Sequence, residues 1–473
     1  MHLKDELQNI SPELLAELDR TMDAMEGAVP VEQLKQELDL TEKGFIKSSR
    51  MNCTKIFRHD PVLFEKIKYN ILSQRVDIIG DVHWDRKSKG DALANSDLRA
   101  IHLYIEETYG VTSEKYMDEA MYLVADENQY HPVRDYLKSL RWDGTPRVRY
   151  ALHHFLGADA SDYTYGLLKF FMLGAVSRAF VPGIKFDYML CLVGSQGAGK
   201  STFFRLLSHK DEWFCDDLKN LDSDSVYQKM MGHWIIEMSE MMGMINAKTN
   251  ETIKSFLSRQ KETFRTPYDR LPEDRPRQCV FAGTTNKMSF LPNDRTGNRR
   301  FLPILCHEED AEVFILDDEE ASRAYVDQMW AEIMEEYNRG NVQLKLSREL
   351  EKAVKDYQQM FMPEDVDAGL ILAFMQETAE DKVCSKQLFK EALGNEYVQP
   401  QRWQTNDICE IVNTLIASGQ LNGWKAFSSP KRFTKGGYGT QKGWERIREP
   451  VNEQMSITDG FLDVEDDEDI PFD

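Results

Sequence analysis

One short stretch of the sequence combines residue types and spacing that suit a phosphate group. Residues 194–201 read GSQGAGKS and fit the pattern GxxxxGK[ST] at every fixed position. Glycines let successive backbone N–H groups face an anion, the lysine ammonium pairs with the β- and γ-phosphates, and the serine hydroxyl binds Mg²⁺. The sequence therefore predicts a site for ATP and Mg²⁺ formed by Gly194, Ser195, Gln196, Gly197, Ala198, Gly199, Lys200, Ser201 and Thr202.

Three polar residues further along the chain are candidates for the hydrolytic step. The run HWIIEMSE at 233–240 is an apolar strand carrying Glu237 and Glu240, and such a strand supplies the acid that binds Mg²⁺ or polarises water. Positions three apart on a strand face opposite sides, so the two acids are not expected to share one role. We expect Glu240 to activate water and Glu237 to bind Mg²⁺, unless Glu237 faces a polar neighbour in the sheet. Asn286, at the tip of the next strand, is predicted to orient the attacking water, although an asparagine there can also simply start a turn.

Arginines follow that strand in the sequence DRTGNRRF. The planar guanidinium of Arg295, Arg299 or Arg300 suits the charge that develops on a transferring phosphoryl group. We expect one of them, with the pair Arg299 and Arg300 preferred, to reach the site of a neighbouring subunit. A salt bridge to Asp294 or a contact with DNA are the alternatives.

The charge balance reverses between residues 254 and 300. This stretch holds eleven basic and five acidic residues, a local balance of +6, and aromatic residues lie among them. Aromatic side chains among basic ones suit base stacking combined with backbone contacts to single-stranded DNA, whereas a solvated loop is the alternative. The residues predicted to bind DNA are Lys261, Arg265, Tyr268 and Arg270.

The elements that must position these residues form an α/β core. Dense apolar runs at 186–194, 233–239, 278–286 and 299–305 are typical of parallel strands buried on both faces. We expect this core at 166–345, after an acidic helical segment at 1–55 and a small, mostly helical domain at 56–165. Three helices and a hairpin around Gly436–Gly437 predict a winged-helix-like domain at 365–448.

The amino-acid composition indicates which cellular compartment and which kinds of partner to expect. The 473 residues carry a net charge of −22, which alone argues against a generic polyanion binder. The seven cysteines are scattered without a CxxC pair, and the amino-terminal residues lack the pattern of a signal peptide. The default expectation is a reduced, cytoplasmic, soluble protein. Nine acids and no base occupy residues 451–473, and they predict a disordered acidic tail.

The motifs together resemble one known family. The segments RVDIIGDVHW, HPVRDYLKSLRWDG, FDYMLCLVGSQGAGKST, WIIEMSE, FLSRQKETFRTPY, RQCVFAGTTN and TGNRRFLPI resemble the virulence-associated protein E family over about residues 60–310. That family occurs in phages, satellite prophages and pathogenicity islands and is similar to superfamily 3 helicases, which are ring-forming AAA+ motors. The resemblance implies a P-loop AAA+ core, a homo-oligomer such as a hexamer, and a helicase or origin-remodelling ATPase acting on DNA.

The resemblance also assigns roles to single residues. It implies Walker A positions at Lys200 and Ser201, a Walker B region at Glu237 and Glu240, and a sensor at Asn286. The superfamily often pairs its Walker B acids side by side, whereas two residues separate them here. Arg265 and Tyr268 fall where the superfamily has its DNA-contacting hairpin, and Arg299 and Arg300 match its arginine pair.

Two further interpretations stay open at this point. A regulatory ATPase that changes partner affinity without moving along DNA is the rival function, and the basic segment before Asn286 is the feature that discriminates the two. The winged-helix-like domain either binds duplex DNA at an origin or caps the motor. The basic residues of its hairpin region are Lys431, Arg432, Lys435 and Lys442.

Overall fold

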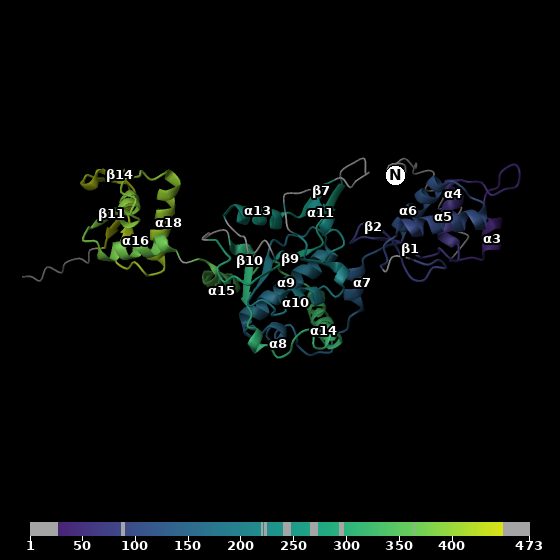
Figure 1. The fold of residues 1–473 in the computed structure, drawn as a ribbon, viewed down its shortest axis with the longest axis horizontal. Helices are drawn as coiled ribbons and strands as arrows, with labels where there is room; N and C mark the ends of the chain where they lie inside the picture. The colour runs from purple at the N-terminus through teal and green to yellow at the C-terminus, as the bar shows by residue number, and fades with distance from the viewer. Residues whose placement is uncertain are drawn as a thin grey trace, which may run out of the picture. The chain divides into compact units, whose positions relative to one another are not determined.

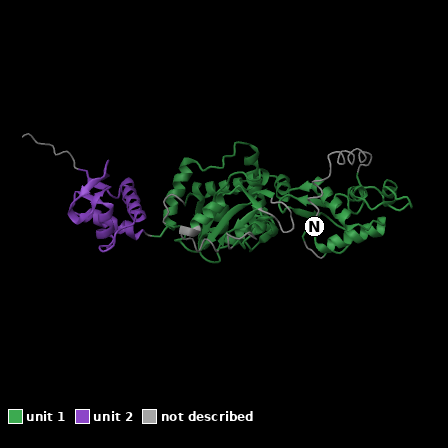
Figure 2. Cartoon of the chain, turned by 90° about the horizontal axis from the view of Figure 1, so that it is seen from above, with its two compact units in different colours: residues 1–363 green, residues 364–473 purple. Residues whose placement is uncertain are grey.

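A computed structural model describes residues 27–86, 90–218, 221, 225–239, 247–264, 273–292, 298–363 and 365–447. The chain divides into two compact units, Met1–Pro363 and Glu364–Asp473 (Figure 2). Each is considered by itself below. The predicted acidic tail at 451–473 lies outside the described residues. No helix in the described parts of the chain is long and apolar enough to cross a membrane.

The first described segment of the first unit is a small α+β layer (Figure 1). Its helices are α3 (Val31–Gln36), α4 (Arg50–His59), α5 (Asn95–Tyr109) and α6 (Glu114–Glu127). The next helix, α7 (Pro132–Ser139), packs instead against α9 (Asp162–Phe180) and α14 (Glu319–Asn338). Its strands β1 (Ile67–Asn70), β2 (Arg75–Ile78) and β3 (Gln129–Tyr130) form a sheet in the order β2-β1-β3. Gly110 ends α5 in the left-handed conformation, as a glycine cap does.

Two sequence expectations concern this segment. The run RVDIIGDVHW predicts strands or a hairpin around Gly80 and Asp81. Its strand β2 pairs with β1 across a turn at residues 71–74, and beyond Gly80 an isolated antiparallel bridge joins Asp77 to Ala92. The boundary expected at residue 55 falls inside α4. Leu34 and Leu38 share one buried cluster with Ile56 and later residues, so residues from 31 onward pack with this layer.

The middle of the unit is a five-stranded parallel sheet in the order β10-β4-β9-β6-β5. The strands are β4 (Met189–Val193), β5 (Phe214–Cys215), β6 (Ile235–Glu237), β9 (Val280–Thr285) and β10 (Phe301–Leu305). Helices around it are α8 (Ala151–Leu156), α9 (Asp162–Phe180), α10 (Lys200–Leu207), α11 (Ser225–Met230), α13 (Ala247–Ser258), α14 (Glu319–Asn338) and α15 (Arg348–Gln358). The boundaries expected at residues 165 and 345 do not separate compact bodies, because α9 and α15 both contact this sheet.

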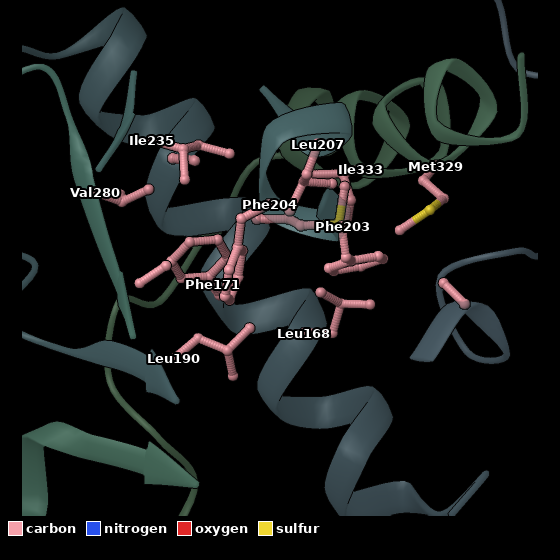
Figure 3. Packing of buried hydrophobic residues seen from close by; sticks show 14 of the residues in the cluster. Leu168, Phe171, Leu190, Phe203, Phe204, Leu207, Ile235, Val280, Met329 and Ile333 are labelled. Carbon is pink, nitrogen blue, oxygen red and sulfur yellow. The ribbon is translucent and has the colours of Figure 1, made fainter. Parts of the chain in front are cut away.

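Both faces of the sheet are buried, and alternate residues enter different cores. On β4, Leu190 and Leu192 join a cluster with α9, α10 and α14, whereas Met189, Cys191 and Val193 join a cluster with α13. Figure 3 shows the first cluster, in which Phe203 and Phe204 of α10 lie between the sheet and the helices α9 and α14. Burial on both faces explains why these strands read as continuous apolar runs.

A separate two-stranded hairpin precedes β9. Strand β7 (Lys261–Phe264) pairs antiparallel with β8 (Glu273–Pro276), and residues 265–272 between them lie outside the described residues. Arg265, Tyr268 and Arg270, three of the four predicted DNA-binding residues, fall in that interval.

The second unit contains α16 (Val366–Glu377), α17 (Ser385–Gln387) continued by a π-helical turn (Leu388–Ala392), and α18 (Arg402–Ala417). Strands β11 (Lys382–Cys384), β12 (Trp424–Ala426) and β15 (Gly443–Arg446) form a sheet in the order β11-β15-β12. Strands β13 (Lys431–Phe433) and β14 (Gly439–Gln441) form a hairpin around Gly436 and Gly437. Lys431 and Lys435 are bonded to Glu445 and Glu380, whereas Arg432 and Lys442 are exposed.

Candidate phosphate and metal site

The glycine-rich loop connects the buried end of β4 to the first turn of α10. Gly197 and Gly199 have φ angles of 94° and 76°, a region that favours glycine. A Cβ on Gly194 would lie 2.6 Å from the backbone oxygen of Cys306, so the loop there has no room for a side chain. The loop conformation therefore depends on glycine at three positions and leads directly into a helix N-terminus, where anions are favoured.

Lys200 lies against this loop. Its Nζ donates to the backbone oxygen of Gly194 at 3.0 Å and to that of Ser195. Burial lowers the pKa of the Lys200 ammonium, while nearby carboxylates including Glu237 and Glu308 oppose that shift. A partly desolvated ammonium with neutral carbonyl partners interacts strongly with an arriving anion, because little water screens it.

Glu237 ends β6 and meets two hydroxyls from other elements. Ser201 Oγ of α10 donates to Glu237 Oε1 at 2.7 Å, and Thr284 Oγ1 of β9 donates to the same oxygen. Glu237 is 1% exposed, and its Oε2 has no hydrogen-bond partner among the described residues. Burial raises the pKa of this carboxyl, and the two hydroxyl hydrogen bonds partly offset that rise.

The donor set fits a magnesium ion. Mg²⁺ prefers oxygen ligands and is held in nucleotide sites by one or two side chains together with phosphates and water. Ser201 Oγ and the unpaired Oε2 of Glu237 are such donors, on adjoining elements. The described residues contain no group of three or more His, Cys, Asp or Glu side chains placed so that they could hold a metal ion, so an ion here would depend on the phosphates as well.

A pocket of about 640 Å³ opens beside these residues. Asn286 and Thr285, at the carboxyl end of β9, line it together with the loop and Ser201. Ser239 and Phe314 also line it, and the sequence patterns did not single them out. Phe314 lies beyond β10, far from any motif. Only the fold brings it to the loop, so no local signal would have identified it.

Residues 137–363 match the model of the virulence-associated protein E-like domain. This part of the chain is a virulence-associated protein E-like domain. The match starts later and ends later than the resemblance expected at 60–310, and it includes α14 and α15.

Solved structures and curated proteins add little to this. Two apo structures of the NrS-1 C-terminal region align over 81% of this chain and 96% of theirs, with 11% and 13% identity and TM-scores of 0.43 and 0.44. No curated protein sequence matches the chain significantly.

Within the virulence-associated protein E-like domain, Arg299 and Arg300 lie at the amino ends of the parallel strands, whereas the loop lies at their carboxyl ends. They precede Phe301, which pairs with Met189 at the start of β4, whereas the loop follows Val193 at its end. Arg300 forms an ion pair with Asp187 at 3.3 Å, and Arg299 is exposed. Neither arginine reaches the loop of its own chain.

The basic stretch of the domain is less free than its balance of +6 implies. On the hairpin, Lys261 forms an ion pair with Asp274, and Arg277 is buried against Glu262. Arg275 contacts Glu273 at 3.3 Å. Several cations counted in the sequence therefore stabilise the hairpin itself. Glu240 and Arg295 lie outside the described residues.

Proposed function

We propose that this protein is an Mg²⁺-dependent ATPase that remodels or unwinds DNA during replication of a phage or mobile element. The observation that carries the proposal is the convergence of Ser201, Glu237 and Thr284 beside a glycine loop that ends in Lys200. Three elements distant in sequence meet at the carboxyl ends of the parallel strands. A P-loop ATPase needs a hydroxyl group, an acidic residue and a polar residue at the end of a strand in this place.

Each residue has a defined part in this proposal. The loop N–H groups and the Lys200 ammonium bind the phosphates, and Ser201 with Glu237 holds Mg²⁺, which when bound neutralises charge on the β- and γ-phosphates. Thr284 keeps the Glu237 carboxylate oriented. Asn286 lines the same pocket and orients water, and Glu240 accepts its proton.

DNA is the proposed partner because residues 137–363 match the virulence-associated protein E-like domain. The resemblance of that family to superfamily 3 helicases implies a replication function. In the proposed AAA+ ring, the β7–β8 hairpin faces DNA, and an arginine reaches the site of the next subunit. The second unit, with three helical segments and a β13–β14 hairpin, is proposed as a winged-helix-like domain that contacts duplex DNA.

The test is ATP hydrolysis and fork unwinding by the full chain and by Lys200→Ala. We expect the variant to lose both activities, because it lacks the Lys200 ammonium group that binds the phosphates in this proposal. Lys345→Ala, which removes an exposed lysine outside this pocket, is the control and should keep both. Normal unwinding by Lys200→Ala would refute the proposal.

One observation favours the rival regulatory ATPase. The described cations of the hairpin are engaged by Asp274, Glu262 and Glu273, which leaves fewer of them for a DNA backbone. The combined variant Arg265→Ala with Tyr268→Ala separates the two functions. Loss of DNA-stimulated hydrolysis supports the motor, whereas unchanged stimulation supports a nucleotide-dependent switch.

A further inference from the structure

A second hollow adjoins the proposed phosphate pocket. It measures about 540 Å³ and is lined by residues of α8, of the segment 308–318 and of α14. Ala198 of the loop and Phe314 line both this hollow and the phosphate pocket. The two spaces therefore meet at Phe314, and a ligand whose phosphates lie at Lys200 can extend into the second one.

Phe314 is placed as a stacking surface. Its side chain is 47% exposed, although a phenylalanine usually buries most of its area, and Val313 beside it is 38% exposed. Both residues line the second hollow. An exposed aromatic ring at the junction of a phosphate pocket and a second cavity presents a π-face on which a nucleotide base can stack.

The remaining walls are rich in hydrogen-bond acceptors. Glu308, Glu312, Asp317 and Asp318 line the hollow, and neither lysine nor arginine is among its lining residues. Glu312 is bonded to Nδ1 of His154, whose ring stacks on Tyr325 with centroids 4.9 Å apart. Carboxylates of this kind bind ribose hydroxyls and exocyclic amino groups, which are donors.

We propose that this hollow receives the nucleoside half of the triphosphate, with an amino-bearing purine stacked on Phe314. The inference rests on the proposed function, because it takes the phosphates to lie at Lys200. The volume of the hollow falls in the range typical of small-ligand pockets, about 300–1,000 Å³. The acceptor-rich wall selects adenosine over inosine, which carries a carbonyl where adenosine has its amino group.

Calorimetric titration of the full chain with ATP, inosine triphosphate and inorganic tripolyphosphate tests the proposal. Phe314→Ala should weaken ATP binding by about 5- to 150-fold, the range expected for one lost base–aromatic stack. Tripolyphosphate, which has no base, should bind the variant as well as the original chain. Leu316→Ala removes an exposed side chain of the same segment that does not line the hollow, and it should change neither affinity.

The outcomes separate this inference from the proposed function. Equal ATP affinity for Phe314→Ala and the original chain would overturn the stacking role, and equal affinity for inosine triphosphate and ATP would overturn the role of the acids. Phe314→Trp, which keeps a ring, should retain ATP binding. If the original chain binds neither ATP nor tripolyphosphate, the proposed function fails instead, and Lys200→Ala, losing both ligands, supports it.

Discussion

At the scale of single residues, Glu237 lowers the stability of the fold but has a proposed role in binding Mg²⁺. It is a buried carboxylate with two hydroxyl donors on one oxygen and none among the described residues on the other. Burying a charge with incomplete hydrogen bonding costs free energy of folding, and burial accordingly raises its pKa. Such a cost is expected where a group must stay ready for a cation.

Glu237→Gln should therefore stabilise the fold while abolishing ATP hydrolysis. Because the folded pKa of Glu237 is raised, the carboxyl destabilises the fold by its full cost at any pH above that pKa. The cost shrinks as pH falls below the folded pKa and is gone once pH falls below the ordinary carboxyl pKa of the unfolded chain. The variant's advantage in Tm should be largest at pH 8, about 1–2 °C for each kcal/mol relieved in a unit of this size, and should shrink at acidic pH.

Thermal melts at pH 8 and pH 5, with Glu309→Gln as the matched control, measure this effect. Glu309 is exposed, so its variant should leave the Tm unchanged at both values. A Glu237→Gln variant that melts lower at pH 8 than the original chain would contradict the argument.

At the scale of elements, close packing of α9 against the segment before β4 sets the position of the sheet. A Cβ on Gly174 of α9 would lie 2.4 Å from the ring of Phe186, which is itself buried. Gly174→Ala should therefore destabilise the first unit by about 1–3 kcal/mol, because the ring must move in a dense core.

The second unit offers a helical glycine with open space around it. Nothing lies within 4 Å of a Cβ built on Gly369 of α16, so Gly369→Ala should stabilise that helix by about 1 kcal/mol. Scanning calorimetry of the full chain measures both substitutions. If Gly174→Ala changes the free energy of unfolding no more than Gly369→Ala does, the contact between α9 and Phe186 is not tight.

The strands of the sheet were predictable, but their order was not. Continuous apolar runs marked β4, β6, β9 and β10 to within a few residues, because burial on both faces leaves a local pattern. The two-residue strand β5 leaves no such pattern and was missed. The insertion of β9 between β4 and β6 depends on long-range pairing, and that order alone brings Thr284 to Glu237. The sequence therefore identified Glu237 and Ser201 but not Thr284, and it overlooked Phe314.

At the scale of the whole molecule, the arginine pair argues for an assembly. The five residues of β10 separate Arg299 from the loop end of the sheet, about 16 Å at 3.3 Å per residue. An arginine side chain does not span that distance along the strand. If Arg299 acts on the proposed phosphate site, it acts on the site of another subunit, through a head-to-tail interface that can close into a ring.

Mixing two inactive variants tests this assembly. Lys200→Ala and Arg299→Ala should each hydrolyse ATP poorly alone. In co-assembled chains, an interface that joins the intact Lys200 of one variant to the intact Arg299 of the other is complete. Random mixing in equal amounts makes about a quarter of the head-to-tail interfaces complete, so we expect about a quarter of the original ATPase rate.

Two further mixtures decide how a partial rate is interpreted. Lys200→Ala mixed with the double variant Lys200→Ala, Arg299→Ala contains no intact Lys200 and should stay inactive. Arg339→Ala, at an exposed arginine in a local pair with Glu336, should keep the original rate by itself. Recovery only in the first mixture places Arg299 across a subunit boundary. Differently tagged chains must first show that the variants co-assemble. If both mixtures are then equally inactive, Arg299 does not act on the site of a neighbouring subunit. It would then have no role in the site, because in its own chain it lies at the opposite end of the strands.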